Sequence, residues 1–235
     1  MSMTREAYDR IRDAIVSGGL ELGEHLSEAA IAAALGMSKA PVRAAFMELR
    51  DNGLVSVVPQ SGTYVFSPTA QDVRTMSEFR ALLENRALRD AFRLRRETML
   101  ERIRASVETM RAALPIRDWD SYRRADNAFH LAFLEECDNP YVLRAHSLTA
   151  STLEALRLRL QGGAGNFRER SFREHVEMLD LLDAGDIDRA AAVLDDHILI
   201  INQWMKGQPY SGDRGTRKLK GEDRDYAAVF AVQQG

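Results

Sequence analysis

Apolar residues in the first part of the chain follow two different periods. They recur every three or four positions through three short stretches, which is the spacing of one helix face, and Ser27 and Ser38 are suited to cap the second and third stretch. Two later runs are rich in β-branched residues and flank a turn with a glycine, which is the pattern of a hairpin. The expected elements are helices at 4–17, 27–35 and 38–51 and strands at 54–58 and 63–66. Three short helices followed by a hairpin predict a winged helix-turn-helix over residues 1–68.

From residue 70 onward helical periodicity dominates and β-branched residues no longer cluster. Stop signals such as Leu114-Pro115 and Gly185-Asp186 divide the pattern into segments. The expected helices lie at about 70–93, 96–113, 119–137, 140–161, 166–184 and 187–206. Six such helices predict an antiparallel all-α bundle over residues 69–206, so the fold class is mainly α. Residues 207–235 are polar and glycine-rich, and we expect a tail that is flexible or docks on a partner subunit.

Composition then narrows the possible classes of protein. The chain has 235 residues, a formal net charge of -3 and a single cysteine, Cys137. One cysteine excludes an intramolecular disulfide and any zinc finger that needs two thiolates from one chain. No apolar run approaches the roughly 20 residues that span a bilayer, and the polar N-terminus lacks the apolar core of a secretory signal. We expect a cytoplasmic protein without a membrane partner, in which any DNA binding comes from local geometry.

The third expected helix carries the candidate DNA-reading residues. In a helix-turn-helix the second helix of the pair lies in the major groove, and its first turns reach the bases. Ser38, Lys39 and Arg43 lie on those turns; Lys and Arg can donate to guanine O6 and N7, and Ser38 can contact a phosphate. Gly62 lets the hairpin tip turn tightly and approach the DNA closely. The plain alternatives are two solvated surface charges and an ordinary hairpin turn.

The charge of this segment sets a condition on DNA binding. Residues 1–68 contain six Lys or Arg and eight Asp or Glu, which is a net charge of -2. Because phosphate neutralisation supplies most nonspecific affinity, a single module is expected to bind DNA weakly. A homodimer that reads a palindromic double-stranded operator would gather enough contacts.

Four motifs in this segment resemble the GntR family of bacterial repressors. They are Leu20-x-x-Gly-x-x-Leu-Ser-Glu28, Leu35-Gly-Met-Ser-Lys-Ala-Pro-Val-Arg43, Leu49-x-x-x-Gly-Leu-Val55 and Ser61-Gly-Thr-Tyr-Val65. The resemblance implies that Ser38–Arg43 reads DNA and that the hairpin is the wing. Lys39 stands where the family usually has Arg, and Ala29 falls near a position where some relatives carry another DNA-contacting Arg. The operator sequence therefore cannot be borrowed from relatives.

Histidines in the bundle segment suggest metal chemistry. Asp126 and His130 are four residues apart on one expected helix and so project from one face, while His175 and His197 lie on two others. Three imidazoles and a carboxylate suit a divalent metal such as Zn, Ni or Mn. Side chains from different helices can meet only in the interior of the bundle, so a site made of them would lie there. For each histidine alone, the alternative is a half-buried side chain with an ordinary hydrogen bond. His25 and His146 match no such pattern and are expected to be structural or exposed.

A second resemblance covers this segment. Asp126-Asn-Ala-Phe-His130, Asn139-Pro-Tyr, Ser171-Phe-Arg-Glu-His175, Gly185-Asp-x-x-x-Ala-Ala191 and His197 are similar to the metal-binding branch of the FadR-type C-terminal (FCD) sensor domain. The resemblance implies that Asp126, His130, His175 and His197 bind the metal. A small organic acid effector would then take an open coordination position, with Arg80 as its cationic partner. For Arg80 the alternative is a surface pair with Glu84, and Arg157 and Arg159 are weaker candidates for the same role.

Together these patterns predict a ligand-responsive, dimeric DNA-binding transcription regulator, most simply a repressor released by its effector, and not an enzyme. One alternative is a metal-dependent hydrolase or lyase. It needs an acid or base beyond the metal ligands, and none is identifiable, because Glu174 and Glu177 flank His175 and are expected to point elsewhere. Another alternative keeps the regulator but makes the metal itself the signal.

Overall fold

A computed structural model describes residues 2–161, 167–205 and 224–231 and divides the chain into two compact units. Unit 1 comprises residues 1–73, 147–162 and 209–235, and unit 2 comprises residues 74–146 and 163–208. The boundaries expected at 68 and 206 stay predictions. The tail expected to be flexible or to dock on a partner falls largely on residues 206–223 and 232–235, which lie outside the described part.

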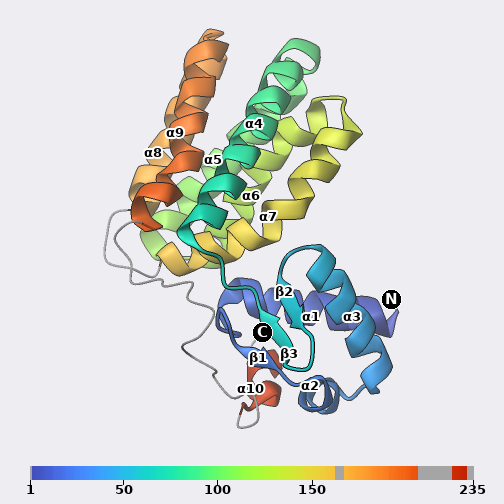
Figure 1. The fold of residues 1–235 in the computed structure, drawn as a ribbon. Coiled ribbons are helices and arrows are strands. Elements are labelled where there is room, and N and C mark those ends of the chain that lie inside the picture. The colour runs from blue at the N-terminus through green and yellow to red at the C-terminus, as the bar shows by residue number, and fades with distance from the viewer. Residues whose placement is uncertain (1, 162–166, 206–223, 232–235) are drawn as a thin grey trace. The chain divides into compact units, whose positions relative to one another are not determined.

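Unit 1 contains the winged helix-turn-helix (Figure 1). Its elements are α1 (Met3–Ser17), β1 (His25–Leu26), α2 (Glu28–Leu35), α3 (Lys39–Asp51), β2 (Val55–Val58), β3 (Gly62–Val65) and α10 (Tyr226–Ala231). The strands form an antiparallel sheet in the order β1-β3-β2, with Val55 opposite Val65 and His25 opposite Tyr64. The three helices and the hairpin agree with the sequence prediction, whereas β1 and α10 were not expected.

Local sequence explains where these helices begin and end. The side chain of Ser27 accepts a hydrogen bond from the Ala30 amide and caps α2, which ends at Gly36 in the left-handed region. Ser38 occupies the N-cap position of α3 without a side-chain cap bond. Their apolar faces meet in a core with these fully buried members: Ile11, Ile15, Ile31, Val42, Leu49 and Leu54.

The position of Gly62, at the start of β3, requires a glycine because of its backbone conformation and because His25 lies close to it. Its φ is +127°, which L side chains rarely adopt, and a Cβ there would lie 2.5 Å from Nε2 of His25. The His25 ring also packs edge-on against Tyr64, with centroids 5.1 Å apart. His25 is therefore a structural residue of the wing, as expected, and Gly62 makes room for it.

Unit 2 holds the helical bundle, which confirms the predicted fold class. Its helices are α4 (Ala70–Leu94), α5 (Arg96–Ile116), α6 (Trp119–Glu136), α7 (Pro140–Gln161), α8 (Phe167–Ala184) and α9 (Ile187–Met205). Helix α5 runs past the stop expected at Leu114-Pro115 and ends at Ile116. Pro115 lies in the last turn, where it removes one backbone hydrogen bond near the helix end and leaves the body of the helix unbroken. Helix α7 supplies its first part to unit 2 and its second part, from Ser147, to unit 1.

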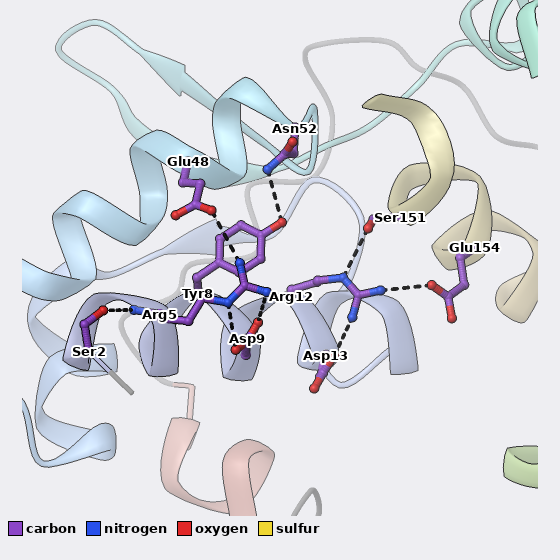
Figure 2. A network of polar contacts seen from close by, with 10 residues as sticks. All are labelled: Ser2, Arg5, Tyr8, Asp9, Arg12, Asp13, Glu48, Asn52, Ser151 and Glu154. Atoms are coloured by element: carbon purple, nitrogen blue, oxygen red, sulfur yellow. Dashed lines mark hydrogen bonds and ion pairs between the residues drawn. The ribbon is translucent and has the colours of Figure 1, made fainter. Parts of the chain in front are cut away.

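Within unit 1, the polar side of α1 is tied to its neighbours by the network in Figure 2. Arg12 donates to Oγ of Ser151 at 3.1 Å and to Oε2 of Glu154 at 3.2 Å, both on the second part of α7. The Tyr8 hydroxyl accepts a 3.1 Å bond from Asn52, at the end of α3.

The described helices include none that is long and apolar enough to cross a membrane.

Candidate functional site

Four predicted ligands converge inside unit 2. Asp126 and His130 project from α6, His175 from α8 and His197 from α9, and one candidate ligand atom from each lies within 4.8 Å of the others. All four side chains are buried. The predicted spacing of four residues on α6 thus brings a carboxylate and an imidazole to the same point as two histidines from other helices.

His130 is held in place by Glu84, on α4. Its Nδ1 lies 2.8 Å from Oε2 of Glu84, and its buried Nε2 has no hydrogen-bond partner among the described residues. Burial lowers the pKa of His130 to about 4, so the ring is neutral near pH 7. A neutral ring that donates from Nδ1 to the carboxylate leaves the Nε2 lone pair for another ligand.

Glu84 is the centre of a buried polar group that the sequence did not predict. It is fully buried, accepts from Nε of Arg80, and lies 3.0 Å from Nε2 of His146 through Oε1. Burial alone would raise the pKa of Glu84, but the Arg80 charge and the two histidine bonds outweigh it and hold the pKa well below its usual range. The alternative of a surface Arg80 is therefore wrong, because Arg80 is buried. Its pairing with Glu84, which the same alternative included, is observed.

His146 is likewise not an exposed residue. It is buried on α7 and shares Glu84 with His130. Nothing in its local sequence distinguishes it, because the pairing joins α4, α6 and α7 only in the folded bundle. His146 therefore contributes to the surroundings of the cluster without being one of the four converging ligands.

Glu174 holds the third histidine of the cluster. Its Oε2 lies 2.9 Å from Nδ1 of His197, and its Oε1 accepts from Arg170 at 2.7 Å. Burial would raise the pKa of Glu174, but the bonds from His197 and Arg170 outweigh it and lower the pKa. The expectation that Glu174 points away from the site is wrong, because its carboxylate faces His197 on α9 and not His175 on its own helix.

His175 occupies the most enclosed position of the cluster. It is fully buried, and its ring packs 4.5 Å from those of Phe129 and His197. Its Nε2 lies 3.7 Å from Oδ1 of Asp126, beyond normal hydrogen-bond range. Three imidazoles and one carboxylate, two of the rings oriented by carboxylates, form the kind of group that binds first-row divalent metals.

The second candidate site lies on α3 of unit 1. Ser38, Lys39 and Arg43 are all exposed around its first turn, as the helix-turn-helix interpretation requires. Arg43 is not a solitary surface charge: its Nε and Nη2 each donate 2.9 Å bonds to the carboxylate of Glu28, the first residue of α2. These bonds raise the pKa of Arg43. Glu28 belongs to the first of the four sequence motifs, but a local motif does not reveal a pairing with Arg43, which lies fifteen residues later in the chain.

Arg157 lies on the part of α7 that belongs to unit 1, while the cluster lies in unit 2. The side chain of Arg159 lies outside the described residues. Arg80 is bonded to Glu84, which in turn holds His130 of the cluster.

Comparisons with known proteins agree with both halves of this architecture. Residues 3–65 match the model of the family described as bacterial regulatory proteins, gntR family, and residues 75–199 match the FCD domain. A relative in Paenarthrobacter nicotinovorans, "Probable D-xylose utilization operon transcriptional repressor", is 30% identical over 193 residues, which cover 80% of this chain and 84% of the relative. HTH-type transcriptional repressor RspR of Escherichia coli (strain K12) is 24% identical over 204 residues, which cover 87% and 89%.

The fold also matches a solved structure. A GntR transcriptional regulator from Rhodococcus sp. RHA1 superposes with a TM-score of 0.75 at 24% identity, over 88% of this chain and 99% of that one. The curated relatives above are named as transcriptional repressors and not as enzymes, which argues against the hydrolase or lyase alternative. The chain is therefore a transcriptional regulator that belongs to the GntR family, with an FCD domain following its N-terminal GntR domain.

Proposed function

We propose that this regulator is a dimeric repressor whose bundle binds a divalent metal, Zn in the first instance with Ni or Mn as alternatives, and a small carboxylate effector. The observation that carries the proposal is the convergence of Asp126, His130, His175 and His197 within 4.8 Å in a buried site. Several named relatives are repressors, which supports that direction of control.

The surroundings of the cluster fit a metal. A buried imidazole nitrogen without a hydrogen-bond partner, such as Nε2 of His130, costs free energy that a coordinate bond would recover. Glu84 and Glu174 each orient one ring, an arrangement that increases ligand basicity in metal sites. The metal would supply a positive charge and open coordination positions for an anionic ligand.

Arg80 is our candidate second contact for the effector. It is buried and bonded through Nε to Glu84, which is itself bonded to the proposed ligand His130. A guanidinium in that position can pair with a carboxylate that also reaches the metal. Effector binding would then draw on both the cluster and the Arg80–Glu84 pair.

Ser38, Lys39, Arg43 and Gly62 are proposed to serve the operator contact, with the base reading concentrated in Arg43. A net charge of -2 over residues 1–68 makes a homodimer on a palindromic site the favoured assembly. The effector changes DNA affinity only if it binds the DNA-competent and incompetent states with different affinities. Acting on operator DNA, the protein would work in the cytoplasm.

Operator binding can be tested with DNA fragments from upstream of its own and neighbouring genes, titrated with purified protein at moderate salt. Binding by a dimer supports the proposal, and absence of any specific complex contradicts it. Repeating the titration with a chelator, and separately with a panel of small organic acids, distinguishes two kinds of signal. An acid response in the metal-loaded protein supports an acid effector, whereas a response to metal removal alone makes the metal the signal.

The metal site has its own test. His197→Ala should lose bound metal, measured by elemental mass spectrometry after dialysis, while the matched control His25→Ala should keep it, because His25 lies in the wing. A His197→Ala protein that retains its metal and its response counts against the site as drawn.

A further inference from the structure

Helix α10 packs against the DNA-binding unit, at the far end of the chain from that unit's other elements. Tyr226 and Phe230 are almost completely buried there, although the helix has only six residues. Its neighbours in unit 1 are α1 and α2, as Figure 1 shows. A segment this short that buries both of its aromatic rings is packed against a complementary surface of the unit.

Directed polar contacts fix the docked position. The Tyr226 hydroxyl donates to the backbone oxygen of His25 at 3.1 Å and accepts from the Ser27 amide at 3.3 Å. Arg224 donates to the backbone oxygen of Gly19 and pairs with the buried Glu24 at 3.4 Å. At the other end, Arg10 donates to the backbone oxygen of Phe230 at 3.0 Å.

The contact of Tyr226 with Ser27 lies next to the residues that support the proposed DNA-reading helix α3. Ser27 caps α2, and the next residue, Glu28, makes the bidentate pair with Arg43 on α3. The Tyr226 hydroxyl therefore fixes the backbone immediately before the carboxylate that orients Arg43. An aromatic residue almost two hundred positions later in the chain thus supports the geometry of the DNA-reading helix.

We propose that the surface formed by the α1–α2 segment and β1 is a docking site for this chain's own segment Arg224–Ala231, and that Tyr226 is a positioning residue for operator recognition by Glu28 and Arg43. The docking half of this inference is independent of the proposed function, and the recognition half rests on it.

Disulfide trapping tests the docking. A Cβ at Gly19 would lie 3.3 Å from Cγ1 of Val229, so a side chain at position 19 would contact the side chain of residue 229. A disulfide joins Cβ atoms that lie about 3.5–4.5 Å apart, which makes this contacting pair the choice for a crosslink. The Gly19→Cys/Val229→Cys protein should form an intramolecular crosslink on mild oxidation, and the control Gly19→Cys/Ala227→Cys, whose second site is exposed, should not. A crosslinked dimer, or no crosslink at all, overturns docking within the chain.

The positioning role is tested in the full-length protein with Tyr226→Phe, which keeps the ring and removes the hydroxyl. Exchange of the Ser27 amide should accelerate at least fivefold, and operator affinity should fall about threefold. In a Glu28→Gln background the same change should leave operator affinity unaltered, since Tyr226 acts through Glu28. An equal loss in both backgrounds overturns the positioning role, whereas absence of DNA binding by the unmodified protein would instead contradict the proposed function.

Discussion

Glu28 and Arg43 face each other across fifteen residues of chain, and two parallel 2.9 Å hydrogen bonds join the carboxylate to the Nε and Nη2 edge of the guanidinium. This arrangement leaves the Nη1 and Nη2 edge directed away from Glu28, and that edge has the fork geometry that matches guanine O6 and N7. The pair also cancels a positive charge that would otherwise attract any phosphate. We therefore propose that Glu28 favours specific over nonspecific DNA binding.

Glu28→Gln is expected to weaken operator binding by about three- to tenfold, because the Arg43 fork loses its support. Nonspecific DNA binding should strengthen at the same time, because one negative charge is removed near the phosphates. Competition titrations with operator and unrelated DNA give both values, and Glu21→Gln, which changes the charge equally at an exposed position, serves as the control. A parallel gain on both DNAs would mean that Glu28 merely competes for Arg43.

Glu174→Gln is expected to lower metal affinity by about 10- to 100-fold, because the carboxylate that orients His197 and increases its basicity is lost. The measurement is a competition titration with a chelator of known affinity. Glu177→Gln is the matched control, since Glu177 lies three residues away on the exposed side of α8. Equal affinities for the two variants would show that Glu174 has no part in the site.

Glu84→Gln is expected to destabilise unit 2 by about 3–5 kcal/mol, because the buried Arg80 charge loses its counter-ion. Denaturant unfolding followed by circular dichroism measures the change in the helical bundle. The double variant Arg80→Met/Glu84→Gln should recover part of the loss, since it buries no unpaired charge. A double variant less stable than the single one would contradict this account of the pair.

Arg12→Ala is expected to speed amide exchange about tenfold in residues 151–157 of α7, which Arg12 holds through Ser151 and Glu154 (Figure 2). Two hydrogen bonds from a charged, partly buried donor contribute more to local stability than an exposed ion pair does. Arg5→Ala is the control, since its partners Asp9 and Glu48 lie elsewhere and are more exposed. Unchanged exchange in α7 after loss of Arg12 would show that other contacts hold it.

Periodicity predicted the helices well, because an apolar stripe and its stop signals are local properties of the sequence. The bundle helices expected at 140–161 and 187–206 are observed at Pro140–Gln161 and Ile187–Met205. Strand β1 escaped prediction because two residues carry no period, and its pairing with β3 is a tertiary contact. Helix α10 escaped because six weakly apolar residues after a polar tail become helical only where the DNA-binding unit buries Tyr226 and Phe230.

The candidate metal ligands were found from a motif, whereas the residues that orient them were not. Arg80 and Glu84 share a helix face by their spacing, but spacing does not say whether that face meets solvent or the bundle interior. Glu174 cannot share a face with its neighbour His175, yet it reaches His197 on the next helix. Such cross-helix pairs depend on how α4, α6, α8 and α9 pack, which one sequence does not specify.

Anomalous diffraction from crystals of the purified protein, measured above and below the zinc absorption edge, tests the central claim most directly. We predict one strong peak per chain, with Asp126, His130, His175 and His197 each donating an atom at about 2.0–2.2 Å. A protein that carries a stoichiometric metal with no peak between these four residues, or a site that stays without a peak after saturation with Zn, Ni and Mn in turn, would contradict it.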